Sequence, residues 1–160
     1  MGGIVMLDRN KIRCLVIILI PLFLSILINR SFVIMSGYVY VMGITSIIFV
    51  VYWFWCGMKF AEYDKNKIKS FVVGNSIWAI SFILFIWQFV LVDGASRYTT
   101  IAIMGQYYQL FMVRNASRII AMCTNTIHSI NVSILAYILM IILFSLGFVF
   151  KIVKMKKDTN

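Results

Sequence analysis

Charged residues are scarce in this sequence, and long stretches contain none. Only 12% of the 160 residues are Asp, Glu, Lys or Arg and 62% are hydrophobic, whereas a soluble domain has roughly 25% charged and 45–50% apolar residues. A chain of this composition has too few polar side chains to cover its apolar surface in water. The scarcity of charge therefore excludes an ordinary soluble domain and indicates a protein whose solvent is lipid.

The uncharged residues form four long runs, over residues 14–29, 31–58, 70–92 and 119–150. A membrane-spanning helix needs about 20 mostly apolar residues. Backbone polar groups in lipid must bond to one another, which favours helices even where Ile and Val are frequent. We therefore predict an all-α membrane protein, a single domain over residues 1–160, in which four transmembrane helices form a bundle. Their expected ranges are about 12–28, 38–58, 71–92 and 130–150.

Residues that carry chemistry are also few. The three cysteines, Cys14, Cys56 and Cys123, form no CxxC pair, so neither a disulfide framework nor a zinc ribbon is expected. Because His128 is the single histidine, we expect no metal site, and we expect no cofactor. Apart from Arg13 at the edge of the first span, no Asp, Glu, Lys or Arg lies within the four predicted spans. That argues against a proton-coupled carrier and against an intramembrane aspartyl protease.

Basic residues exceed acidic ones by 15 to 5, which gives a net charge of +10. They lie at the ends of the apolar runs, so they favour orientation in an anionic membrane over binding of nucleic acid. Basic residues accumulate on the cytoplasmic side of membrane proteins. With the N-terminus inside, the cytoplasmic segments contain Arg9, Lys11, Arg13, Lys59, Lys65, Lys67, Lys69, Lys151, Lys154, Lys156 and Lys157. Arg30, Arg97, Arg114 and Arg118 remain outside. We therefore expect both termini in the cytoplasm and an anionic cytoplasmic leaflet as the lipid partner.

The bias toward Ile, Lys and Asn is typical of an AT-rich bacterial genome, so the expected location is a bacterial cell membrane. The aromatic run Tyr52-Trp53-Phe54-Trp55 lies near the cytoplasmic end of the second run. Aromatic residues at that depth are typical of an interfacial belt.

The segment over residues 98–122 is more apolar than an ordinary loop but is interrupted by polar residues. We predict an interfacial or re-entrant helix between the third and fourth spans. A fifth span is the alternative, although it would leave the C-terminal lysines outside. The expected outer polar surface comprises Tyr98, Gln106, Tyr107, Tyr108, Gln109 and His128.

Small residues recur at spacings of three and four along each predicted helix, which keeps them on one face. Helices in lipid associate through small residues, close packing and hydrogen bonds. Pro21 removes the amide hydrogen bond to the carbonyl of Ile17 and should kink the first helix, for packing rather than for gating. The candidate packing residues are Cys14, Pro21, Ser25, Gly43, Ser46, Gly57, Gly74, Ser81, Gln88, Ser133, Ala136 and Gly147.

These features favour a protein without catalytic machinery that acts through helix–helix or partner contacts, as an accessory, regulatory or immunity-type protein. The partner would be another membrane protein or further copies of this chain. A small oligomeric transporter or channel for an apolar or weakly polar solute is the alternative. A membrane thiol enzyme that uses Cys123 and His128 is more remote, because on one helix these two residues would diverge by about 140°.

Overall fold

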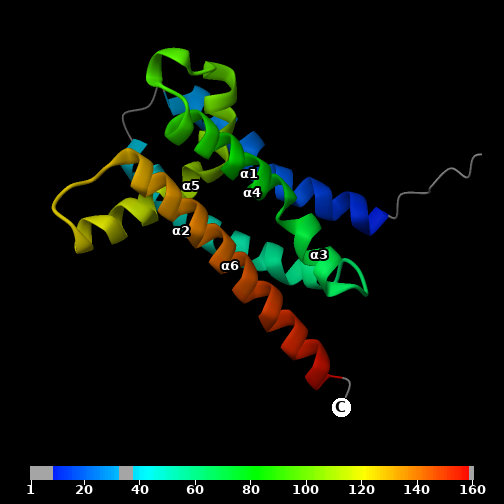
Figure 1. The fold of residues 1–160 in the computed structure, drawn as a ribbon. Helices are drawn as coiled ribbons and strands as arrows, with labels where there is room; N and C mark the ends of the chain where they lie inside the picture. Colours follow the sequence, from blue (N-terminus) through cyan, green and yellow to red (C-terminus); the bar gives the residue numbers. More distant parts are fainter. Residues whose placement is uncertain (1–8, 33–37, 159–160) are drawn as a thin grey trace, which may run out of the picture.

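The computed structural model describes residues 9–32 and 38–158, and every regular element in these residues is helical. Figure 1 shows the long helix α6 running alongside α2, with its last turns projecting beyond the other helices. The elements in chain order are α1 (Arg9–Phe32), α2 (Tyr38–Ala61), α3 (Lys67–Gly74), α4 (Ser76–Ile86), the π-helical turn η1 (Trp87–Leu91), the short 3-10 turn η2 (Gly94–Ser96), α5 (Thr99–Cys123) and α6 (Ser129–Lys157).

The helices are compatible with a membrane protein. Two of them are long and apolar enough to cross a membrane, α2 from Met42 to Ala61 and α6. The pair formed by α3 and α4 with η1 meets the same test as one bent span, and α1 has a shorter apolar stretch, Ile12–Ile28. Large apolar side chains such as Ile47 and Val51 are 65% exposed on the outside of α2. Exposure of these apolar side chains to water would cost free energy, and contact with lipid would avoid that cost.

The single helix predicted over residues 71–92 is wrong in two respects. The helical segment begins earlier, at Lys67, and it is broken between α3 and α4, where the axis bends by 46°. Gly74 is crowded at the break, because a Cβ atom there would lie 2.8 Å from Cγ of Phe60. The carbonyl of Phe71 accepts two hydrogen bonds from Asn75. One comes from the backbone N–H and the other from the side-chain Nδ2, at 2.9 Å. A glycine followed by a side chain that competes for a helical carbonyl is a recognised cause of kinking.

Aromatic side chains fill the interior between α2, α5 and α6. Trp53, Tyr108, Tyr137 and Phe144 are completely buried. Nε1 of Trp53 donates to the carbonyl of Met140 at 2.8 Å, and Nε1 of Trp78 donates to the carbonyl of Tyr137 at 3.0 Å. The expected aromatic belt is therefore wrong for Trp53, whose ring faces the core because its indole N–H has an acceptor on α6.

The backbones of α2 and α6 touch at two glycines. A Cβ atom at Gly57 would overlap the carbonyl oxygen of Phe144, and a Cβ atom at Gly147 would overlap the carbonyl oxygen of Phe54. The two contacts are reciprocal, since each glycine faces the backbone of the other helix. Small residues that admit a close backbone approach are the usual means of helix association in lipid.

Helix α5 is packed into the bundle rather than laid on its surface. Its buried residues include Gly105, Tyr108 and Met112. Gly105 lies against the backbone of Phe85 in α4, with a hypothetical Cβ 3.1 Å from the Phe85 nitrogen, and its carbonyl accepts from the hydroxyl of Tyr137 in α6. Helix α5 also contacts α1, α2 and η1. The segment predicted over residues 98–122 is thus helical and packed among the other helices, and its interfacial or re-entrant placement stays a prediction. Helix α5 lies outside the set of helices apolar enough to cross a membrane.

Substitution of Gly57 or Gly147 by alanine should destabilise the bundle, because the added methyl has backbone rather than a flexible side chain as its neighbour. We expect a loss of about 1–3 kcal/mol for each, the usual range for overpacking. Gly94→Ala is the matched control, since nothing lies within 4 Å of its Cβ position. Unfolding in mixed micelles with increasing dodecyl sulfate measures the loss. Equal midpoints for Gly57→Ala and Gly94→Ala would contradict the close contact.

Candidate functional site

The seam between α1 and α2 is organised around Pro21. Proline has no backbone N–H, so the carbonyl of Ile17 loses its helical partner. The hydroxyl of Tyr52 in α2 donates to that carbonyl at 2.6 Å. The hydroxyl of Tyr108 in α5 donates to the next carbonyl, that of Ile18, at 3.2 Å. Two tyrosines from two other helices therefore bond to the backbone of α1 at its proline.

An apolar cavity of about 250 Å³ opens beside this junction. Its wall, to which Tyr52 also contributes, consists almost entirely of hydrocarbon side chains. They come from α1, α2 and α5 and include Ile20, Pro21, Leu24, Ile48, Phe49 and Phe111.

A second cavity, of about 450 Å³, lies where α1 begins and α2 ends; we call it the basic cavity. Its charged residues are Arg13 on α1, Lys59 on α2 and Glu62 just after α2. Cys14, Ile17, Trp55 and Tyr63 complete the wall. Ile17 thus belongs to the basic cavity and is bonded through its carbonyl to Tyr52 of the apolar cavity.

Glu62 is held by lysines rather than directed at an open space. One carboxylate oxygen lies 2.5 Å from Nζ of Lys151 on α6, and the other lies 3.7 Å from Nζ of Lys59. The hydrogen bond from Lys151 lowers the pKa of Glu62 below its usual value. Nζ of Lys59 also lies 5.8 Å from the centroid of the Trp55 ring. The carboxylate therefore stays ionised at neutral pH, paired mainly with Lys151.

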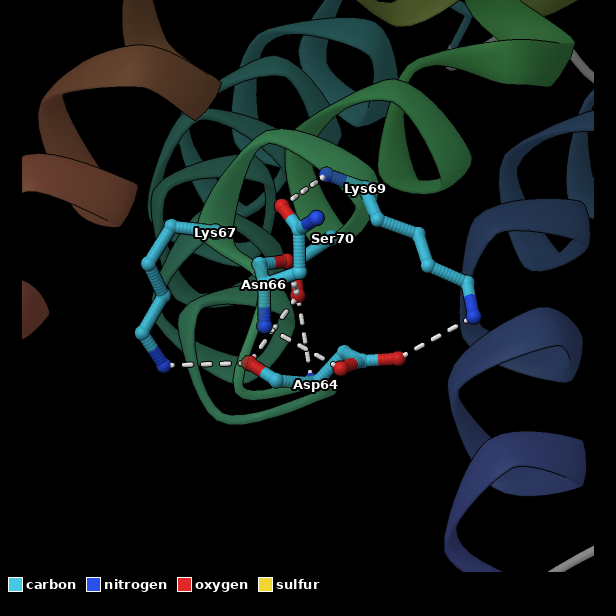
Figure 2. A network of polar contacts seen from close by, with 5 residues as sticks. All are labelled: Asp64, Asn66, Lys67, Lys69 and Ser70. Atoms are coloured by element: carbon cyan, nitrogen blue, oxygen red, sulfur yellow. Dashed lines mark hydrogen bonds and ion pairs between the residues drawn. The ribbon is translucent and has the colours of Figure 1, made fainter.

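The turn between α2 and α3 forms a polar network, which Figure 2 shows. Asn66 caps α3 by accepting from the backbone N–H of Lys69 at 3.1 Å. Nζ of Lys67 donates to the carbonyl of Asp64 at 3.1 Å, and Nζ of Lys69 lies 3.3 Å from the Asp64 carboxylate. The buried hydroxyl of Ser70 accepts from the backbone N–H of Asp64 at 3.0 Å. These contacts fix the short turn and neutralise its aspartate.

Most of the predicted packing residues lie inside the bundle. Gly57, Gly147 and Ser81 are buried, and the structure places Cys14, Gly43 and Ser133 half-buried. The buried members of the predicted set also include Pro21, Ser25, Ser46, Gly74, Gln88 and Ala136. Several of these residues meet partners from other helices, but they do not form one continuous interface.

Gln88 lies in the π-helical turn η1 and is completely buried. Its Oε1 accepts from the backbone N–H of Tyr98, the residue that precedes α5, at 2.9 Å. Its Nε2 has no partner among the described residues, and neither does Oε1 of the buried Gln109. Gln88 therefore fastens the end of the α4 segment to the start of α5.

The expected outer polar surface is divided by the structure. Tyr98, Gln106 and His128 are exposed, and Tyr107 is half-buried. Tyr108 and Gln109 were expected at the surface, and that expectation is wrong: they are 0% and 1% exposed. They lie on the face of α5 that packs against the other helices, where Tyr108 finds its acceptor in α1.

Cys123 and His128 do not lie on a common helix. Cys123 ends α5, His128 precedes α6, and both side chains are exposed. Between them, Oγ1 of Thr124 donates to the carbonyl of Thr126 at 3.0 Å. In the described part of the chain, no three His, Cys, Asp or Glu side chains are grouped closely enough to hold a metal ion.

The chain matches no family model, no curated protein and no solved structure with which it was compared. Its function therefore has to be inferred from its own residues.

The Tyr52 hydroxyl should matter only while residue 21 is proline. We expect Tyr52→Phe to destabilise the protein by about 1–3 kcal/mol, because the Ile17 carbonyl is left unpaired. In a Pro21→Ala background the restored amide occupies that carbonyl, so the same substitution should have much less effect. Unfolding in mixed micelles of the two single variants and the double variant gives the coupling energy.

Tyr98→Phe serves as the control for loss of a tyrosine hydroxyl, because Tyr98 is 65% exposed. A coupling energy near zero between residues 21 and 52 would mean that the tyrosine does not compensate for the proline.

Proposed function

We propose that this chain is a multi-pass protein of a bacterial cell membrane that acts without catalysis, through contact with another membrane protein. An accessory, regulatory or immunity-type role is the class that fits. The observation that carries the proposal is the closed interior. Bulky aromatic side chains occupy the space between α2, α5 and α6, and α2 and α6 touch backbone to backbone. A bundle with a filled interior leaves its outer surface as the place where another molecule binds.

A small oligomeric transporter or channel is the second candidate. The buried amides of Gln88 and Gln109, each with one unpartnered atom, favour it, because polar groups at membrane depth often line a solute path. The aromatic filling within one chain disfavours a path through a single copy. A path would then require several copies.

The proposed orientation has both termini in the cytoplasm, supported by the concentration of lysines on the α2–α3 turn and at the end of α6. Cys123, which is exposed between α5 and α6, then lies outside the cell.

In a Cys14→Ser, Cys56→Ala background, a membrane-impermeant maleimide should label Cys123 in intact cells. A cysteine introduced as Lys65→Cys in a chain without the native cysteines should be labelled only after permeabilisation. Lys65 is exposed in the α2–α3 turn, so its protection would reflect the membrane. The reverse pattern would overturn the orientation.

Photo-crosslinking tests the contact function. The photoreactive residue p-benzoylphenylalanine is placed singly at exposed Ile47 on α2, Ile83 on α4 and Ile142 on α6. Contact with a partner protein should give a discrete light-dependent adduct from one of these faces, while the other faces give lipid adducts only. Blotting and mass spectrometry of the adduct identify the partner.

An adduct with a second copy of this chain as the sole protein product would favour the oligomeric transporter instead. Lipid adducts from every face would overturn the contact function.

A further inference from the structure

The two cavities on the seam are joined along α2. A shallow groove on the outer face of α2 is lined by Ile47, Ile48, Val51, Tyr52 and Trp55. Ile48 and Tyr52 also line the apolar cavity, and Trp55 also lines the basic cavity. The three hollows therefore adjoin one another along α2, with an apolar end and a charged end.

This surface is long enough to extend through the hydrocarbon of one leaflet of a bilayer. Thr45 at the apolar end and Lys59 at the basic end are fourteen positions apart on α2, or about 21 Å along a helix that rises 1.5 Å per residue. The hydrocarbon of one leaflet is about 15 Å thick, half of the bilayer core. A headgroup at Lys59 therefore leaves room for an acyl chain to reach the cavity beside Pro21.

The charged end has an excess of positive charge. Arg13 makes no ion pair within residues 9–32 and 38–158, and Lys59 lies at a long 3.7 Å from Glu62. Glu62 itself is paired at 2.5 Å with Lys151, and the nearby Asp64 is paired with Lys69. The two acids are thus matched by lysines outside the cavity, which leaves Arg13 and Lys59 to attract an anion. Arginine and lysine are the usual ligands of phosphate.

We propose that the seam between α1 and α2 binds a phospholipid with an anionic headgroup. One acyl chain lies in the apolar cavity against Leu24, Ile48 and Phe111, and the phosphate lies between Arg13 and Lys59. Trp55 is half-buried at the join, where an amphipathic indole suits the boundary between headgroup and chain. Lipid replaces helix contact here, which explains why α1 is bonded to α2 through a tyrosine rather than by close backbone packing.

The full-length protein in detergent micelles is titrated with dioleoylphosphatidylglycerol or dioleoylphosphatidylcholine, and bound lipid is counted by native mass spectrometry. We expect phosphatidylglycerol to be retained in preference to phosphatidylcholine. The double variant Arg13→Gln, Lys59→Gln should bind phosphatidylglycerol about 10- to 30-fold more weakly than the native chain does, since each basic residue near a membrane contributes about a factor of five. The double variant Lys65→Gln, Lys154→Gln removes the same charge from exposed sites and should change the affinity less than threefold.

A second pair of variants tests the acyl chain. Leu24→Trp fills the apolar cavity and should weaken binding of phosphatidylglycerol about tenfold, whereas Ile83→Trp on the outer face of α4 should leave it unchanged. Glycerol 3-phosphate, which has the phosphate without a chain, should not displace the lipid at equal concentration. All variants are first compared with the native chain by circular dichroism and thermal unfolding.

Three outcomes would overturn the proposal. The first is equal loss of affinity in the two charge variants, which would indicate diffuse attraction. The second is displacement by glycerol 3-phosphate at equal concentration, which would indicate a phosphate site without lipid. The third is equal retention of the two lipids by the native chain.

Discussion

A proline inside a helix leaves a backbone carbonyl without its helical donor, and much of this structure depends on how that deficit is met. In lipid an unpaired carbonyl is costly, so a donor has to come from the protein. Here it comes from Tyr52, with Tyr108 bonded to the neighbouring carbonyl. The carbonyl that Pro21 leaves without a donor thus bonds α1 to α2, and the neighbouring carbonyl of Ile18 bonds α1 to α5. Pro21 is therefore a point of attachment as well as a break in hydrogen bonding.

The two sides of α2 are held by different means. Toward α6 it offers Gly57, and the two backbones touch. Toward α1 it offers Tyr52, whose long side chain bridges a wider separation and leaves a cavity on each side of the bridge. One side of α2 thus forms a rigid interface and the other an open seam. The basic side chains Arg13 and Lys59 lie at the seam between α1 and α2.

Much of this arrangement was readable in the sequence. The uncharged runs identify the apolar helices, and the small-residue pattern includes Gly57 and Gly147, where the backbones of α2 and α6 touch. The break at Asn75 was missed although Gly74-Asn75 within an apolar run is a breaker signal, because the length of the run favoured one span.

Tyr108 and Gln109 were misplaced for a different reason. Tyrosine and glutamine near a membrane are typical of its surface, and their burial depends on acceptors in distant parts of the chain. The acceptor of Tyr108 is a carbonyl ninety positions away. No local pattern reveals such a pairing.

The position of α6 in the chain has a consequence for biosynthesis. Trp53 donates to the carbonyl of Met140 and Trp78 donates to the carbonyl of Tyr137, and both carbonyls belong to α6. So do the backbone atoms that lie against Gly57 and the lysine that holds Glu62. Helices α1 to α5 leave the ribosome before α6, and until α6 is in place the two indoles lack these acceptors and Glu62 has only the more distant Lys59. The nascent protein therefore passes through a stage in which these groups are open to chaperones and to proteases, and the packing of α6 against α2 ends that exposure.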